Sequence, residues 1–231
     1  MMDLITTAEA EALILSFKIS ATAVCCALPL AIMTATLLSR PGFPGKIIVD
    51  GITHLPLILP PVVMGYLLLV TLGTRAPLGA FLQDTFGIKF VFSWTGAALA
   101  AGIVTFPFQV RAIRLAMEAI DPGLIAAAKT LGAGPIDHFT SITLPLAMPG
   151  IIAGAITAFA ASLGEFGAII TFVSNIPGET RTLPLAIYTA IQTPGGETIA
   201  ARLVTLSIAL AFSGLVLSEI ANRRIKRHLN R

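Results

Sequence analysis

The chain alternates between long apolar runs and short polar connections. A helix needs about 20 mostly apolar residues to cross a bilayer. Five stretches reach that length, at about 12–38, 47–72, 94–117, 146–172 and 200–221. Each run is continuous rather than alternating in short segments, which favours helices over a membrane β-barrel. The pattern therefore predicts an all-α integral membrane protein with five transmembrane helices in a single domain, 1–231.

Composition and charge add an orientation to this picture. The chain is 55% hydrophobic and only 12% charged, whereas soluble domains are about one-quarter charged. Cytoplasmic loops of membrane proteins are enriched in Lys and Arg. The tail after the fifth run is basic, with Arg223, Arg224, Lys226, Arg227 and Arg231, and the N-terminal segment carries Asp3, Glu9 and Glu11. We therefore expect the N-terminus outside and the C-terminus in the cytoplasm.

The second apolar run contains Pro56, Pro60 and Pro61. Each proline lacks an amide hydrogen and clashes with the carbonyl four residues earlier. In a bilayer the freed carbonyl groups must find other partners. We expect this segment to be kinked and to face protein or a wet cavity. The kink has two possible roles, which are helix packing and the lining of a transport pathway.

Glu165 is the one carboxylate placed deep in an apolar run. On insertion scales, a charged residue at a helix centre costs about 2.5–3.5 kcal/mol. Its small neighbours Ser162, Gly164 and Gly167 would let another helix approach closely. Glu165 could be a proton or cation site of a transporter, or a structural group that hydrogen-bonds across a helix interface. The structural role is favoured because no second membrane carboxylate is available to form a relay.

The segment 121–145, between the third and fourth runs, has the pattern of a helix, a tight turn and a second helix. Asp121 suits an N-cap and Pro122 the first helical position. Gly132 suits the position just past the end of a helix. A helix lying on lipid would favour a strongly basic polar face, but Lys129 is the only basic residue here. We expect this segment to dock on a cytoplasmic protein.

Motifs for chemistry are missing from the sequence. It has no P-loop, GxSxG or HExxH motif, which are the signatures of nucleotide binding, serine hydrolysis and zinc proteolysis. His54, His138 and His228 are too scattered for a metal site. We therefore expect no catalytic residue, no metal and no cofactor on this chain, and any ATP hydrolysis must belong to a partner.

The segment 121–145 resembles the cytoplasmic motif of ABC importer permeases, which reads E-A-A, three residues, Gly, nine residues, Ile, one residue and Leu-Pro. The residues that match this spacing are Ala127, Ala128, Gly132, Ile142, Leu144 and Pro145. Ala126 stands where the family usually has Glu. The segments 54–69, 93–121, 162–184 and 192–197 closely resemble molybdate importer permeases, to which sulfate and tungstate permeases are related.

This resemblance implies the type I ABC importer permease fold and a place in the bacterial cytoplasmic (inner) membrane. It implies a second permease copy that completes the pathway, two ATP-binding subunits that hold ATP and Mg²⁺, a periplasmic oxyanion-binding protein, and no nucleic acid. The expected ATPase-coupling residues are Ala127, Ala128, Leu131, Gly132, Ala133, Gly134, Ile142, Leu144 and Pro145.

The candidate pathway residues are Pro56, Pro60, Pro61, Ser162, Glu165, Thr171 and Thr205. Arg202 could attract anions, or extend its side chain to the lipid headgroups, and the second role is favoured. The predicted function is that of a molybdate importer permease acting as a homodimer. The alternatives are a sulfate or tungstate permease and, in a different class, a membrane scaffold or enzyme that uses Glu165.

Overall fold

The computed structural model describes residues 6–40 and 42–229, the side chains of 215–229 excepted. All regular elements in this part of the chain are helical. They are α1 (Thr7–Ser39), α2 (Lys46–Ile58), α3 (Pro61–Leu72), α4 (Pro77–Phe86), α5 (Trp94–Glu118), α6 (Pro122–Thr130), α7 (Pro135–His138), the π-helical turn η1 (Phe139–Thr143), α8 (Leu144–Leu163), α9 (Gly167–Val173), α10 (Leu183–Gln192) and α11 (Glu197–Leu229). The all-α prediction is confirmed.

The centre of the fold is α5, which packs against both α1 and α8, and these two helices also contact each other. Small residues make these close contacts possible. A Cβ atom added to Gly102 of α5 would lie 3.4 Å from the carbonyl oxygen of Ala23, and one added to Gly154 of α8 would lie 3.2 Å from Cα of Gln109. The backbones of α1, α5 and α8 therefore approach one another almost directly.

Among the described residues, four helical stretches are long and apolar enough to cross a membrane. They are Thr7–Ser39, Trp94–Glu118, Pro135–Leu163 and Glu197–Gly214. The bent pair α2 and α3 would make a fifth crossing if the pair forms one span. The first span begins earlier than the predicted residue 12. The Thr6 side chain and the carboxylate of Glu9 cap each other's backbone N–H groups, so α1 starts at Thr7.

The predicted kink in the second run is a sharp break. The axes of α2 and α3 differ by 113°. Pro56 is accommodated inside α2, whereas Pro60 and Pro61 occupy the N-cap and the first turn of α3. The missing amide hydrogens of these two prolines prevent α2 from continuing into α3.

The prediction of one continuous span over 146–172 is wrong. α8 ends at Leu163, and α9 begins only at Gly167. A Cβ atom on Gly167 would lie 2.9 Å from Cβ of Pro61, so the start of α9 is pressed against the start of α3. The break thus lies beside a packing contact between segments distant in the sequence, and Glu165 lies in the break rather than in a helix.

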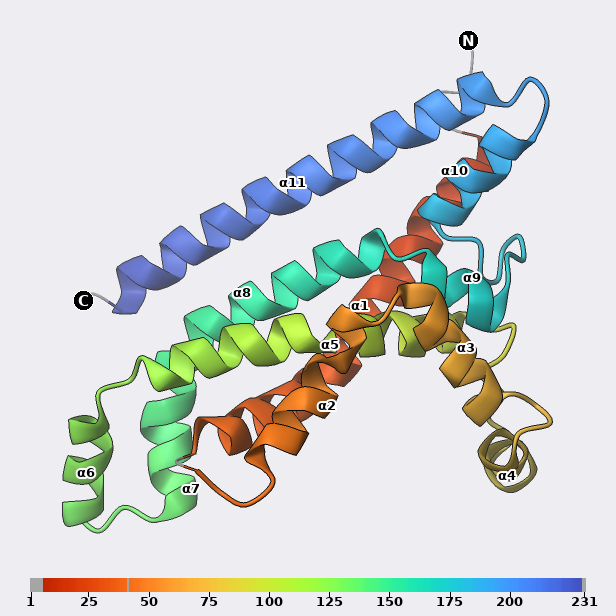
Figure 1. Cartoon of the computed structure of the whole chain (residues 1–231). Coiled ribbons are helices and arrows are strands. Elements are labelled where there is room, and N and C mark those ends of the chain that lie inside the picture. Colours follow the sequence, from red (N-terminus) through yellow and green to blue (C-terminus); the bar gives the residue numbers. More distant parts are fainter. Residues whose placement is uncertain (1–5, 41, 230–231) are drawn as a thin grey trace.

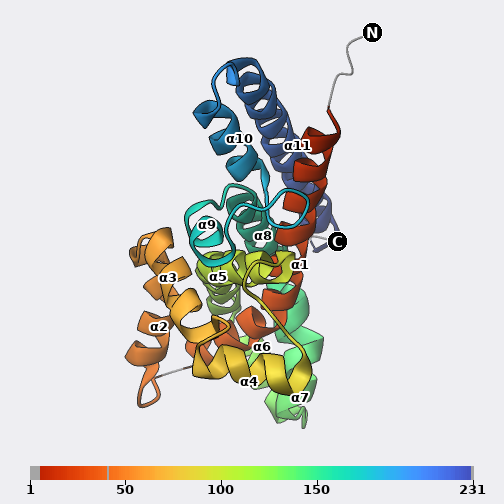
Figure 2. The same ribbon diagram turned by 90° about the vertical axis from the view of Figure 1, so that its right-hand side faces the viewer.

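The helices form an elongated bundle whose two ends differ (Figure 1). α6 and α7 project from one end of α5, while α4, α9 and α10 lie toward the other end (Figure 1). Figures 1 and 2 show α2 and α3 on one side of α5 and α11 on the opposite side. This arrangement separates the segment 121–145 from the break at Glu165 by the length of the bundle.

A candidate docking loop and transport pathway

The segment 121–145, here called the docking loop, is built by two local caps. The Oδ1 atom of Asp121 accepts the N–H of Gly123 at 2.8 Å and starts α6. At the other end Gly132 has φ +88°, a left-handed conformation that favours glycine. The N–H of Gly132 donates to the oxygen of Lys129, and that of Ala133 to the oxygen of Ala128, both at 3.0 Å. This is a Schellman motif, so the predicted helix end at Gly132 is confirmed.

The tip of the docking loop presents apolar side chains to its surroundings. None of the residues in α6, α7 and η1 is buried. The side chains of Leu131 and Ile136, on either side of the turn, are 89% and 79% exposed. Exposed apolar groups that cluster at a projecting tip mark an interaction surface. The geometry therefore provides a rigid, apolar-tipped projection.

The second helix of the docking loop is longer than the sequence suggests. A short helical piece ending near Pro145 is predicted, but the chain runs as one helical stretch from Pro135 to Leu163. The π-helical turn Phe139–Thr143 directly precedes Leu144 and Pro145. Such a turn re-registers the backbone hydrogen bonds, which lets a proline occupy the first turn of α8. The docking loop is thus continuous with a bundle helix.

The nine predicted coupling residues share one stretch but differ in burial. Ala128, Ala133, Ile142 and Leu144 are half-buried, while Ala127, Leu131, Gly132, Gly134 and Pro145 are exposed. Leu144 packs against the apolar cluster formed by α1, α5 and α8, whereas the exposed members are open to the surroundings in the single chain.

Part of the predicted pathway set is brought together at the contact between α3 and α9. A Cβ atom on Gly65 would lie 2.6 Å from the oxygen of Ala168 and 2.8 Å from Cβ of Thr171. Pro60 and Pro61 begin the same α3 helix, and Glu165 lies just before α9. Four of the seven predicted residues therefore belong to the two helices that meet here or directly precede them.

Glu165 is 7% exposed, and its carboxylate has a local partner. Its Oε1 atom accepts the N–H of Ala168 at 2.8 Å, so the carboxylate caps the first turn of α9. The backbone N–H of Glu165 in turn donates to the oxygen of Ser162 at 3.1 Å. The carboxylate therefore has a structural role, but its hydrogen bond is local to the start of α9 and does not cross a helix interface as predicted.

The other pathway candidates lie elsewhere. Ser162, at the end of α8, is buried, and its hydroxyl has no hydrogen-bond partner in the described part of the chain. Pro56 lies in α2, before the break. Thr205 is exposed on α11, across α5 from α3, and its hydroxyl donates to the oxygen of Ala201 at 2.8 Å. The structure of one copy therefore does not gather all seven residues into one channel.

Two ion pairs between helices were not predicted from the sequence. Arg202 Nε lies 2.8 Å from Oε1 of Glu9. The side chain is therefore paired within the protein, and both predicted roles for it, attraction of anions and extension to the lipid headgroups, are wrong. Arg114 Nη1 lies 2.9 Å from Oδ1 of Asp50. The sequence feature that could have indicated these pairs is the presence of isolated acidic and basic residues at the ends of apolar runs. Within the described residues, no group of three His, Cys, Asp or Glu side chains is placed to hold a metal ion.

Comparison with known proteins gives close relatives over nearly the whole chain. Residues 27–227 match the family model of the binding-protein-dependent transport system inner membrane component. The chain is 60% identical over 216 residues to the molybdenum transport system permease protein ModB of Escherichia coli (strain K12), which covers 94% of each chain. It is 52% identical over 221 residues to ModB of Haemophilus influenzae, which covers 96% of each.

A more distant relative is the sulfate transport system permease protein CysT of Salmonella typhimurium, 34% identical over 85% of this chain and 72% of that protein. Among solved structures, a chain of a bacterial alginate ABC transporter in complex with an alginate pentasaccharide-bound periplasmic protein superposes with a TM-score of 0.77. That match has 20% identity and covers 95% of this chain and 80% of the other. At this identity the likeness establishes the fold, which is that of ABC importer permeases.

Proposed function

Since this chain belongs to the family of inner membrane components of binding-protein-dependent transport systems, we propose that it is the permease subunit of an ATP-driven molybdate importer. It is a transport subunit with several membrane-spanning helices rather than an enzyme. The observation that carries the choice of substrate is the identity of 60% and 52% to two molybdenum permeases, against 34% to a sulfate permease.

The docking loop is the part of the chain that couples transport to ATP. In this proposal Leu131 and Ile136 insert into an apolar groove of an ATP-hydrolysing subunit, which holds the ATP and Mg²⁺. A few residues that fill pockets of the partner carry most of the affinity of an interface, and the proposal assigns this role to Leu131 and Ile136. Ala126 cannot form an ion pair, so recognition depends on shape and apolar contact around Gly132.

The orientation follows from the same assignment. The docking loop and the basic C-terminal tail face the cytoplasm, and the N-terminus, α4 and α10 face the outside of the inner membrane. Two copies of the chain form the pathway between them, and two ATP-hydrolysing subunits bind at the cytoplasmic side. A periplasmic protein delivers the oxyanion to the outer side.

The predicted pathway residues suit brief passage rather than tight binding. Prolines, Ser162, Thr171 and Thr205 offer hydroxyl and carbonyl groups but no positive charge. A strong cationic site would hold an oxyanion and slow its release. High affinity therefore resides in the periplasmic binding protein, and the permease contributes a polar path with low affinity.

Two alternatives remain testable. A sulfate permease has the same architecture, and tungstate has nearly the size and charge of molybdate. A scaffold or enzyme based on Glu165 is less well supported, because that carboxylate caps α9.

Uptake of labelled molybdate in cells that express the chain with its neighbouring transport subunits tests the proposal. Tungstate at equal concentration is expected to compete, whereas a hundredfold excess of sulfate is not. Equal competition by sulfate would identify a sulfate permease. No uptake of any of the three oxyanions, in cells that contain the assembled complex, would favour the scaffold or enzyme class.

A further inference from the structure

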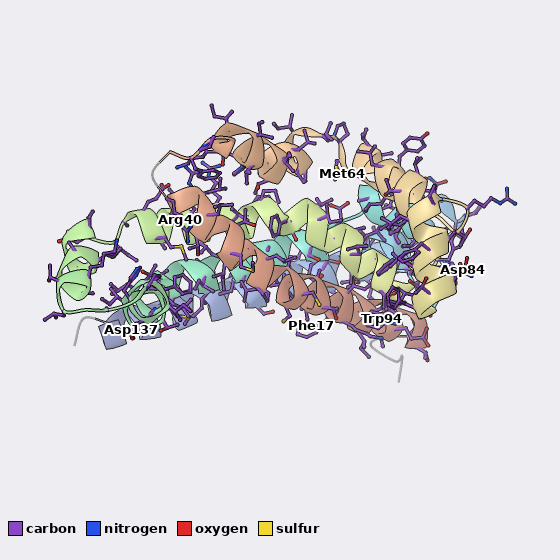
Figure 3. The ribbon with its side chains drawn as sticks, turned by 90° about the horizontal axis from the view of Figure 1, so that it is seen from below. Phe17, Arg40, Met64, Asp84, Trp94 and Asp137 are labelled. Carbon is purple, nitrogen blue, oxygen red and sulfur yellow. The ribbon has the colours of Figure 1, made fainter. Side chains whose placement is uncertain are left out.

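The helix α2 is loosely packed for an element of a membrane bundle. Of its thirteen residues only Thr53 is buried. Ile47, Ile48, Ile52 and Ile58 are all strongly exposed in the single chain. Seen from below, α2 lies along the outside of the α1 and α5 helices, which it contacts (Figure 3). Apolar packing therefore gives α2 little hold on the rest of the chain.

A charged contact fastens α2 to α5. Arg114 of α5 donates from Nη1 to Oδ1 of Asp50 in α2 at 2.9 Å. Its Nε atom donates to Oε1 of Glu118, in its own helix, at 2.7 Å. The Nδ1 atom of His54 lies 2.9 Å from the backbone oxygen of Asp50. The planar guanidinium thus bonds two carboxylates at once, but only the bond to Asp50 joins two helices.

The position of this contact in the fold gives it its significance. Arg114 belongs to the last turns of α5, and α5 leads directly into the docking loop at Asp121. Asp50 belongs to α2, which leads through the break at Pro60 into α3. α3 in turn packs against α9 through Gly65. The Arg114–Asp50 contact therefore links the helix that carries the docking loop to the broken segment.

We propose that the Arg114–Asp50 contact is a strut that carries movement of the docking loop into the α2–α3 segment. The proposal rests on the proposed function, in which the docking loop binds the ATP-hydrolysing subunit. Partly exposed ion pairs add little to stability, and these side chains are 25% and 42% exposed. Loss of the strut leaves the fold intact but lets α2 move independently of α5. Arg114 and Asp50 act as positioning residues and need not touch the substrate.

The test uses the permease reconstituted in proteoliposomes with its ATP-hydrolysing and oxyanion-binding partners. All variants carry Glu118→Gln, so that Arg114 has Asp50 as its only carboxylate partner. On this background Asp50→Asn, Arg114→Gln, the double variant and the charge exchange Asp50→Arg with Arg114→Asp are compared. The quantity measured is molybdate taken up per ATP hydrolysed, at equal amounts of assembled complex.

With Glu118→Gln alone, the molybdate taken up per ATP hydrolysed is expected to stay within twofold of that of the unmodified protein, since this change removes only the contact within α5. Each single variant at Asp50 or Arg114 is expected to lower the uptake per ATP at least fivefold. The uptake per ATP of the double variant should be no lower than that of either single variant. The charge exchange should restore at least half of the uptake per ATP of the Glu118→Gln background. Effects that multiply in the double variant, or a charge exchange that recovers nothing, would overturn the strut.

A second measurement does not depend on transport. Spin labels at Ile48→Cys of α2 and Leu115→Cys of α5, both exposed positions, report the distance between the helices after Cys25 and Cys26 are changed to Ser. We expect Asp50→Asn to broaden this distance distribution and Glu118→Gln to leave it unchanged. An unchanged distribution in Asp50→Asn would refute the strut even if the complex transports nothing. Absence of ATP-dependent uptake by the unmodified complex, with the distance result as expected, would instead refute the proposed function.

Discussion

The guanidinium of Arg202 lies 2.8 Å from the carboxylate of Glu9 and joins the start of α11 to the start of α1. Glu9 is 3% exposed, and its second oxygen accepts the backbone N–H of Thr6 at 2.7 Å. A single carboxylate thus caps the first helix of the chain and anchors the last. The ion pair thus links the first turn of α1 to α11, two helices at opposite ends of the sequence.

Replacement of Arg202 should therefore destabilise the bundle. Arg202→Gln leaves the buried Glu9 carboxylate with fewer partners, which costs about 1–3 kcal/mol. For a chain of this size, the midpoint Tm should fall by roughly 2–4 °C for each kcal/mol. Thermal unfolding of the purified permease in detergent measures this shift. Adding Glu9→Gln to Arg202→Gln should restore part of the loss, and a further additive loss would contradict the pairing.

Gly132 is expected to be the residue of the docking loop least tolerant of a side chain. Gly132→Val forces a β-branched residue into φ +88°, which costs about 1–3 kcal/mol of local strain and distorts the turn that presents Leu131. Uptake of molybdate should fall at least tenfold while the amount of permease in the membrane stays normal. Gly178→Val is the matched control, because Gly178 also has positive φ and open space but lies between α9 and α10. Equal losses in both variants would show that strain alone is responsible.

Leu131 and Ile136 should act as the anchors of the ATPase contact. Leu131→Ala and Ile136→Ala remove the two most exposed apolar side chains of the docking loop. Loss of an anchor residue costs about 2 kcal/mol or more, so binding of the ATP-hydrolysing subunit should weaken about thirtyfold. Titration of that subunit against permease in nanodiscs measures the affinity. Thr140→Ala, a change at an exposed position of η1, should leave it unchanged; weakening by Thr140→Ala alone would place the interface elsewhere.

Glu165→Gln should preserve uptake to within twofold. The amide oxygen of Gln can still accept the N–H of Ala168, whereas Glu165→Ala removes the cap of α9, which is worth about 0.5–2 kcal/mol. Uptake and thermal stability are measured for both variants. Complete loss of uptake in a normally assembled Glu165→Gln variant would demonstrate a role that requires the charge.

The orientation has a direct test. A reporter fused after the C-terminal residue should give the signal of a cytoplasmic location. The same reporter inserted between α10 and α11, near Gly195, should give the signal of a location outside the membrane. The basic tail and the docking loop then lie on the same side of the membrane, as coupling to ATP requires. A periplasmic signal from the C-terminal fusion would reverse the whole assignment.

Features that depend on neighbouring residues could be predicted from the sequence. The Asp121 cap and the Gly132 turn each close hydrogen bonds over a few positions, so the residue types at those positions are sufficient evidence. The break near Pro60 is equally local, because a proline removes its own amide hydrogen wherever it is placed. Long apolar runs likewise indicated a helical membrane protein, since the bilayer requires the helix to satisfy its own backbone.

Features that depend on distant contacts required the structure. The apolar pattern continues through Glu165, whereas in the folded chain α8 ends at Leu163 and the next helix begins at Gly167, where it packs closely against α3. Similarly, the sequence shows Glu9 near the start of the first apolar run and Arg202 near the start of the fifth, but it does not show that the two side chains meet. The order of residues was enough to predict the membrane class and the turn at Gly132, because the first depends on the bilayer and the second on hydrogen bonds between near neighbours. Tertiary packing alone decided where the fourth run breaks, and which charges meet, because both depend on helices that the folded chain brings together.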